Sequence, residues 1–239
     1  MYHHRSTLGP VELAFTDRHG GVSGVPFDSL NLAFFEHGER AVPQRNLEIL
    51  LDDFAPGCPV VDLSQVHGRH VAVAAPGEPR PQGDGLVTDR PDVVLLVRAA
   101  DCVPVLFADP AAGVLGAAHA GRAGVAAGVV PATVQAMRDL GAADVTAWIG
   151  PHVCGACYEV PVELQDEVAD AVPATRATTS WGSPSLDLGA GVRAQLEADG
   201  VRVLDVSACT RESPDLYSYR RDGAGSGRLA GLIRRAVAS

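Results

Sequence analysis

Apolar residues gather in three consecutive runs near the middle of the chain, over residues 92–97, 102–108 and 113–119. Valine, leucine and alanine dominate these runs, and polar residues do not alternate with them as they would in a strand with one wet face. Such runs predict strands that are covered on both faces. The segment Asp-Pro-Ala-Ala-Gly at 109–113 predicts a hairpin connection between the second and third strands.

Weaker patterns predict the remaining elements. Further strands are expected over 11–15, 69–75, 145–149 and 201–206, with a loosely alternating segment at 60–66, a long loop at 16–31 and a turn at 82–86. Helical spacing of apolar residues predicts helices over 41–53, 124–140, 162–172, 186–199 and 228–237, with a kink or restart at Pro131. Strands and helices mix without strict βαβ alternation, which favours an α/β sandwich of mixed sheets over a doubly wound fold.

Composition limits the classes of function. The chain has 239 residues, of which 46% are hydrophobic, and we expect one catalytic domain over 1–239. A net charge of −10 argues against a nucleic-acid surface and against binding to an anionic membrane. All 19 basic residues are arginine, so Schiff-base chemistry and a P-loop lysine are excluded.

Targeting and redox signals are few. The apolar runs are shorter than the ~18 residues that a membrane span requires, and the N-terminus lacks the pattern of a signal peptide. The five cysteines are an odd number, so reduced thiols and a cytoplasmic location are the expectation.

Three soft-metal donors stand at the ends of apolar segments. They are His67 in Ser-Gln-Val-His-Gly, Cys102 in Ala-Asp-Cys-Val-Pro and His119 in Ala-Ala-His-Ala-Gly. Each residue alone is more often structural, a hydrogen-bonded imidazole or an inert buried thiol. Together, two imidazoles and a thiolate suit zinc and leave a fourth position open for water or substrate. Because the three are far apart in sequence, only tertiary structure can assemble such a site.

Other residues carry weaker signals. Asp101 is the carboxylate nearest to Cys102, and we assign it a catalytic role as proton shuttle or as support for a metal ligand. The pair Cys154-Gly-Ala-Cys157 is a rival site, either half of a zinc knuckle or a redox pair. No second Cys-x-x-Cys exists, Cys209 is isolated in sequence, and His152 is too close to the pair for the usual spacing.

Taken together, the motifs resemble one bacterial family. Its members have been called laccase-domain or polyphenol oxidase proteins and are regarded as zinc-dependent purine nucleoside phosphorylases with adenosine deaminase activity. The matching segments, in order, are 15–23, 29–32, 65–68, 99–105, 118–121, 149–151, 157–160 and 218–223. The resemblance therefore covers nearly the whole chain, and several motifs in sequence make it specific.

This resemblance implies a single-domain α-β-β-α sandwich and a metal held by His67, Cys102 and His119. It also implies that Asn31 and Arg45 contact the purine. The family often has Trp-Arg where this chain has Arg122-Ala123. If the usual arginine binds phosphate, Arg122 has to take its place, and Arg45 and Arg98 are the other arginines considered for phosphate.

The expected substrates are therefore purine nucleosides and phosphate, acted on with Zn²⁺ by a monomer or homodimer. Adenosine, inosine and guanosine are the expected nucleosides. Copper is the alternative metal, because imidazole and thiolate also suit copper. A copper-dependent, laccase-like polyphenol oxidase is the second hypothesis, although eight histidines are few for a multicopper cluster. A non-catalytic binding protein with a relic metal site is the third.

Overall fold

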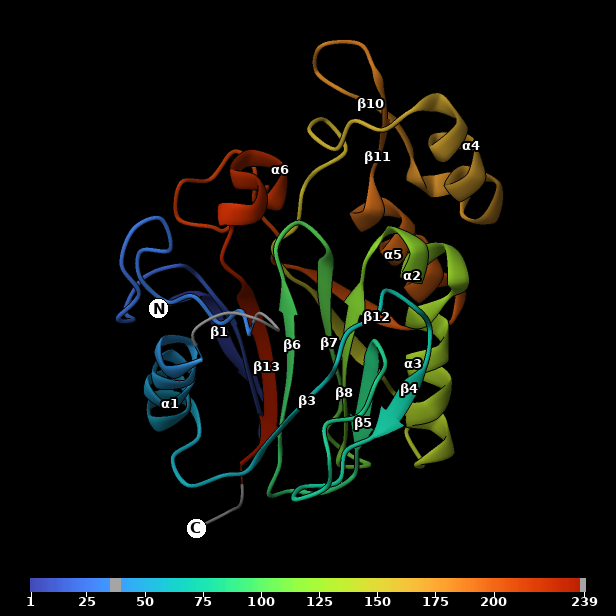
Figure 1. Ribbon diagram of the computed structural model, residues 1–239. Coiled ribbons are helices and arrows are strands. Elements are labelled where there is room, and N and C mark those ends of the chain that lie inside the picture. The colour runs from blue at the N-terminus through green and yellow to red at the C-terminus, as the bar shows by residue number, and fades with distance from the viewer. Residues whose placement is uncertain (35–39, 237–239) are drawn as a thin grey trace.

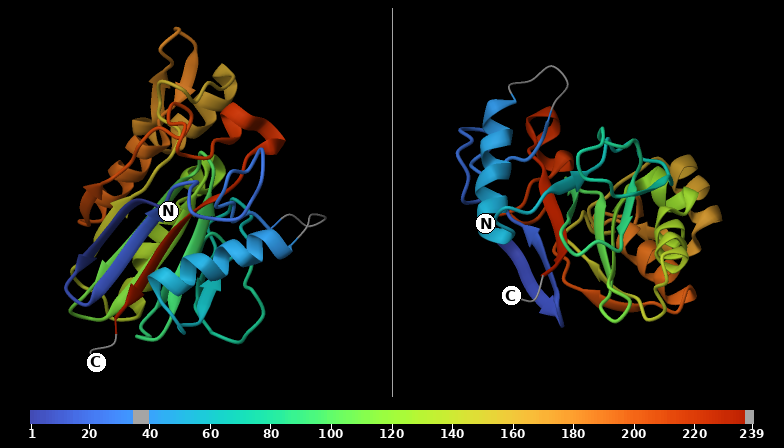
Figure 2. Two further views of the ribbon diagram at one scale, coloured as in Figure 1. Left: turned by 90° about the vertical axis from the view of Figure 1, so that its left-hand side faces the viewer. Right: turned by 90° about the horizontal axis from the view of Figure 1, so that it is seen from below.

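Two β-sheets packed face to face form the centre of the molecule, and helices cover their outer faces (Figure 1). The structure is a computed structural model that describes residues 1–34 and 40–236. Seen from below, helix α1 (Ala41–Phe54) lies on one side of the sheets and the other long helices lie on the opposite side (Figure 2). This α-β-β-α order confirms the expected mixed α/β sandwich.

The first sheet has the strand order β1-β2-β13-β6-β3. Its strands are β1 (Tyr2–Leu8), β2 (Val11–Thr16), β13 (Leu229–Arg235), β6 (Val94–Ala99) and β3 (Val60–Asp62). Only β3 runs parallel to its neighbour, so the sheet is mixed. Helix α1 packs on its outer face through Leu47, Leu50 and Phe54.

The second sheet has the order β12-β9-β7-β8-β5-β4. Its strands are β12 (Arg202–Asp205), β9 (Thr146–Ile149), β7 (Val103–Asp109), β8 (Val114–Ala120), β5 (Gly85–Thr88) and β4 (Val71–Val73). Four helices surround its outer face: α2 (Arg122–Ala127), α3 (Val129–Asp139), α4 (Val162–Ala171) and α5 (Leu188–Ala198). A hairpin of β10 (Arg176–Thr178) and β11 (Pro184–Leu186) extends beyond α4, and a short helix α6 (Tyr219–Asp222) precedes β13.

The prediction of strands covered on both faces is confirmed. Every residue of β6, β7 and β8 is buried, because their side chains alternate between the interior of the sandwich and a helix-covered face. The predicted hairpin joins β7 to β8 within one residue of the expected bounds. The helix expected after His119 is interrupted at Gly128, which has a left-handed φ of 84°, and restarts as α3 with Pro131 in its first turn.

One predicted element is wrong, and one predicted turn is shorter than expected. The C-terminal helix expected over 228–237 is strand β13, which lies between β2 and β6, while residue 237 lies outside the described residues. Apolar positions at Leu229, Leu232 and Ile233 fit a helix as well as a strand, and pairing on both edges selects the strand. The turn expected at 82–86 ends early, because β5 begins at Gly85.

Candidate metal centre and pocket

The three predicted donors meet where the chain crosses between the two sheets. His67 follows β3 of the first sheet and precedes β4 of the second, and Cys102 stands between β6 and β7 in the same way. His119 lies on β8, one residue from its end, and pairs with Pro104 of β7. The crossings bring together segments that are far apart in sequence at one end of the sandwich.

The donor atoms of His67, Cys102 and His119 all lie within 4.8 Å of one another. The two imidazole rings meet edge to face, with centroids 4.8 Å apart and an interplanar angle of 81°. The three side chains differ in exposure: His119 is buried, Cys102 is half-buried and His67 is exposed. The trio therefore has one side packed against the protein and one side facing outward.

The surroundings favour the charged form of the thiol. Burial opposes ionisation of Cys102, but the charge and hydrogen bond of His119, aided by His67, outweigh it and lower the pKa of the thiol to about 6. Burial likewise opposes protonation of His119, yet Cys102 and Asp84 raise the pKa of its imidazole to about 9. A thiolate is the form of cysteine that binds a metal.

Asp84 accepts hydrogen bonds from two of these donor residues. Its carboxylate accepts a hydrogen bond from the Nδ1 of His119 at 2.9 Å, and from the backbone N–H groups of His67 and Gly68 at 3.0 and 2.7 Å. Burial would raise the pKa of Asp84, but these hydrogen bonds lower it, so the carboxylate is ionised. Because Nδ1 is engaged, Nε2 is the nitrogen of His119 available to a metal.

The donor set fits a catalytic soft-metal site. Two imidazoles and one thiolate, with a carboxylate fixing the tautomer of one imidazole, are the ligands that zinc takes when it keeps an open coordination position. The same donors also suit copper. The exposed side of His67 supplies the direction from which a substrate can approach.

The trio opens into a pocket of about 1170 Å³. Its described lining has an excess of basic side chains, because the two aspartates Asp62 and Asp101 face five arginines: Arg40, Arg80, Arg98, Arg220 and Arg228. An apolar part is formed by Ala33, Leu47 and Leu63, and Tyr158 lies under the guanidinium of Arg220 at 4.4 Å from its ring centroid. The pocket therefore combines surfaces for an anion and for an aromatic base.

Arg98 has unused hydrogen-bonding capacity. It is 6% exposed and forms an ion pair with Asp62 through Nη1, while its buried Nε and Nη2 have no hydrogen-bond partner among residues 1–34 and 40–236. Buried guanidinium donors normally have partners, because leaving them unpaired is costly. An oxygen-rich anion in the pocket is a partner of the right chemistry.

Asp101 borders the same pocket but is held in place on both oxygens. It accepts hydrogen bonds of 2.6 Å from the Oγ1 of Thr210 and from the backbone N–H of Arg220. Its φ of 83° lies in the left-handed region, at the turn that directs Cys102 into the site. These contacts hold the carboxylate in a fixed orientation beside Cys102, and its role as proton shuttle or as support for a metal ligand stays a prediction.

The residues assigned to substrate by the resemblance lie outside this lining. Asn31 is buried, and its Oδ1 accepts hydrogen bonds from the backbone of Ala33 and Arg228, which places it behind the pocket wall. Arg45 is exposed on α1 and pairs with Glu48. Arg122 begins α2, and its charge opposes the rise in the pKa of Tyr158 that burial causes. Their contact with substrate stays a prediction.

Sequence reasoning missed several residues of the site. Asp84 stands in Gly83-Asp84-Gly85, a pattern that by itself predicts only a turn. Tyr158 lies in the motif at 157–160 and Arg228 lies outside the motifs, and neither has a local pattern that indicates a pocket. Tertiary pairing alone places them there.

Comparisons with known proteins show the family of this chain. The family described as multi-copper polyphenol oxidoreductase laccase matches residues 12–236. A Streptomyces coelicolor protein named a purine nucleoside phosphorylase is 49% identical over 240 residues, covering 98% of this chain and 99% of its own. A Mycobacterium tuberculosis protein of the same name is 45% identical, covering 91% of this chain and 89% of its own.

Solved structures show the same architecture. The Neisseria meningitidis protein NMB0706 superposes with a TM-score of 0.87 at 33% identity, covering 98% of this chain and 99% of its own. YlmD from Geobacillus stearothermophilus superposes with a TM-score of 0.84 at 31% identity, covering 95% and 93%. The likeness extends over the whole sandwich.

Proposed function

The chain belongs to the family described as multi-copper polyphenol oxidoreductase laccase, and from that premise we propose that it is a metal-dependent purine nucleoside phosphorylase. Relatives named purine nucleoside phosphorylase are up to 50% identical to this chain over most of its length. One observation carries the proposal: a catalytic-type donor set, His67, Cys102 and His119, opens into the same pocket as five arginines. Such a pocket suits an anion and a neutral base together.

The basic part of the pocket is the phosphate site in this proposal. Within the described part of the chain, Arg98 has two guanidinium nitrogens without a partner, and the Nη1 of Arg228 donates to the carbonyls of Ser226 and Gly227. Paired N–H groups of arginine match the geometry of phosphate oxygens. Arg220 stacks on Tyr158 and donates to the carbonyl of Glu159, so it is held in place at the rim.

Phosphorolysis joins a phosphate oxygen to C1′ of the ribose while the bond from C1′ to N9 of the purine breaks. The electron pair of that bond moves onto the purine, which takes up a proton and leaves. The arginines hold the phosphate and offset its charge as it approaches the ribose, and the apolar lining at Leu47 and Leu63 limits water around the base. When bound, zinc supplies Lewis-acid chemistry in this pocket.

A second activity, adenosine deamination, belongs to the same proposal. In that reaction water adds to the purine carbon that bears the amino group, and ammonia leaves to give inosine. Zinc deaminases use a related donor set of one histidine and two cysteines. The accompanying H-x-E motif is absent from this chain, so a different residue has to move the proton.

Product analysis tests both activities. We expect purified protein, incubated with inosine and phosphate, to release hypoxanthine and ribose 1-phosphate, and to release neither when phosphate is omitted. Adenosine is expected to give adenine with phosphate, and inosine without it. No product from adenosine, inosine or guanosine under either condition would favour a binding protein with a relic site. Oxidation of a phenol by copper-loaded protein would favour the polyphenol oxidase.

A further inference from the structure

A second group of metal donors lies behind the wall of the pocket. Cys154 and Cys157 belong to the segment after β9, and Cys209 and Glu212 belong to the segment after β12. The sequence places Cys209 alone, but the fold brings it to the Cys-x-x-Cys pair. All four donor atoms lie within 4.8 Å of one another.

The sheet explains why these two segments meet. Strands β9 and β12 are parallel neighbours, and Ile149 pairs with Asp205 at their ends. Both segments leave the same edge in the same direction, and a parallel bridge between His152 and Cys209 continues the pairing. Backbone hydrogen bonds from His152 to Ala208 and from Thr210 to His152 fix the register. The donors are therefore juxtaposed by regular backbone pairing.

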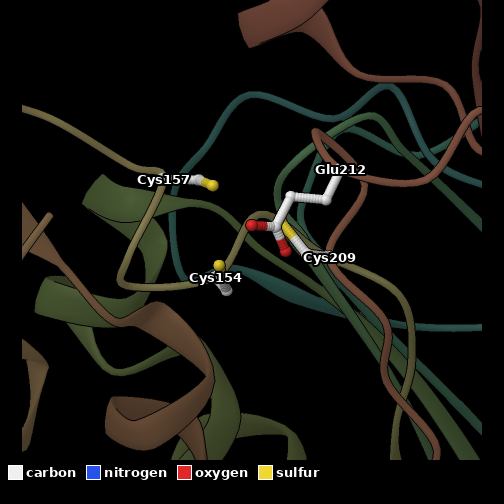
Figure 3. Close-up of side chains that lie close together, drawn as sticks. All are labelled: Cys154, Cys157, Cys209 and Glu212. Carbon is white, nitrogen blue, oxygen red and sulfur yellow. The ribbon is translucent and has the colours of Figure 1, made fainter. Parts of the chain in front are cut away.

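The side chains converge on one point. Figure 3 shows Cys154 and Cys157 on one segment, facing the thiol of Cys209 and the carboxylate of Glu212 on the other. None of the three cysteines forms a disulfide. Sulfur ligands of a tetrahedral zinc ion stand about 3.8 Å apart, given a Zn–S bond of about 2.3 Å. The observed spread thus needs only small side-chain adjustments.

The spacing is that of a two-knuckle zinc site. Cys154-x-x-Cys157 and Cys209-x-x-Glu212 have the same separation, with glutamate in the place of a fourth cysteine. We propose that Cys154, Cys157, Cys209 and Glu212 bind a structural zinc ion. Four protein donors fill a tetrahedral ion, so this site has no open position and differs in kind from the catalytic-type trio. Cys157 is buried and Glu212 is exposed, which places the carboxylate on the solvent side.

The proposed ion cross-links two parts of the pocket wall. Cys157 is followed directly by Tyr158, which lines the pocket, and Cys209 is followed by Thr210, whose hydroxyl holds Asp101 beside Cys102. The ion thus joins the segment that carries Tyr158 to the segment that positions Asp101. Its role is to hold these walls in register, without touching the substrate.

A metal count with matched variants tests the proposal. Protein purified without chelator is expected to hold two equivalents of zinc by elemental analysis. Cys209→Ser is expected to lose one equivalent, whereas Cys58→Ser, a change at the cysteine that belongs to neither donor group, keeps both. Cys102→Ala is expected to lose the other equivalent and to keep the one at the cluster. The metal count does not depend on turnover. It can therefore contradict the structural zinc site while the proposed activity is retained, and it can support that site while the activity is absent.

Cobalt substitution provides a second readout that leaves all three cysteines of the cluster intact. In Cys102→Ala protein, Co²⁺ is expected to give the thiolate charge-transfer and visible bands of a tetrahedral sulfur-rich site. Glu212→Gln is expected to weaken Co²⁺ binding, and Glu212→Cys to strengthen it and intensify the charge-transfer band. Absence of zinc and of these bands in Cys102→Ala protein, or a Cys154–Cys157 disulfide found by peptide mapping of protein prepared with a thiol-blocking reagent, would overturn the proposal.

Discussion

Asp84 accepts a hydrogen bond from Nδ1 of His119 at 2.9 Å, and the two side chains are 0% and 4% exposed. This contact fixes the imidazole orientation and leaves Nε2 for a metal. The same carboxylate also accepts hydrogen bonds from the backbone of His67 and Gly68. One buried acid therefore sets the position of two of the three donors.

Asp84→Asn is expected to weaken metal binding by about 10- to 100-fold, since the amide cannot supply the same charge and acceptors. Competition with a chromogenic chelator measures this loss. Asp92→Asn is the matched control, because Asp92 is an exposed acid paired with Arg90. Equal metal affinities in Asp84→Asn and Asp92→Asn would show that Asp84 does not contribute to metal binding.

His119→Ala is expected to abolish metal binding at the trio and nucleoside turnover together. The imidazole supplies one of three donors, and a two-donor site binds zinc weakly. Elemental analysis and product chromatography on the same preparation provide the two readouts. Full turnover by a variant that has lost this metal would exclude the proposed mechanism.

Arg98→Lys is expected to raise the KM for phosphate by roughly 10- to 100-fold, the effect of losing a charge-assisted hydrogen bond of about 1.5–3 kcal/mol. Lysine keeps the charge but not the forked donors of the guanidinium. Steady-state kinetics with varied phosphate measures the change, and the KM for the nucleoside is expected to move less. Arg138→Lys is the control, because Arg138 contacts only the carbonyl of Asp199 among the described residues. An unchanged phosphate KM in Arg98→Lys would place the anion elsewhere.

Asp109→Asn is expected to destabilise the fold by about 2 kcal/mol at neutral pH. Asp109 accepts hydrogen bonds from the backbone N–H groups of Ala111, Ala112, Ala143 and Asp144. Burial would raise its pKa, but these donors lower it below the ordinary carboxyl value. Its contribution to stability is therefore complete above the ordinary pKa and is lost as pH falls through the lower, folded-state pKa.

Urea unfolding at neutral and at acid pH measures this contribution. The gap in stability between wild type and Asp109→Asn is expected to narrow as the pH falls, since the wild-type carboxylate becomes protonated. Gln135→Ala, which removes only a surface contact with Asp139, is expected to leave the stability nearly unchanged. A gap that stays constant with pH would show that Asp109 does not titrate as proposed.

None of the described helices is both long and apolar enough to span a membrane.

The local sequence pattern predicted much of the sandwich. It failed where pairing with distant strands decides whether a segment is a helix or a strand. The runs that became β6, β7 and β8 were recognisable because burial on both faces leaves an unbroken apolar stretch. Strand β13 was mistaken for a helix, because its apolar positions satisfy either period and only its neighbours β2 and β6 select the strand. The edge strand β1 was missed, since its polar sequence carries no such signal.

The sequence by itself identified His67, Cys102 and His119, because soft donors at the ends of apolar segments are a chemical signal that needs no coordinates. Only the tertiary structure decided that Asp84 supports them and that Cys209 and Glu212 join Cys154 and Cys157. The type of a residue determines what its side chain can bind. The local hydrophobic period indicates on which face of a helix or strand the side chain lies. Which distant segments become neighbours depends on strand order and register, and these follow from pairing between residues far apart along the chain.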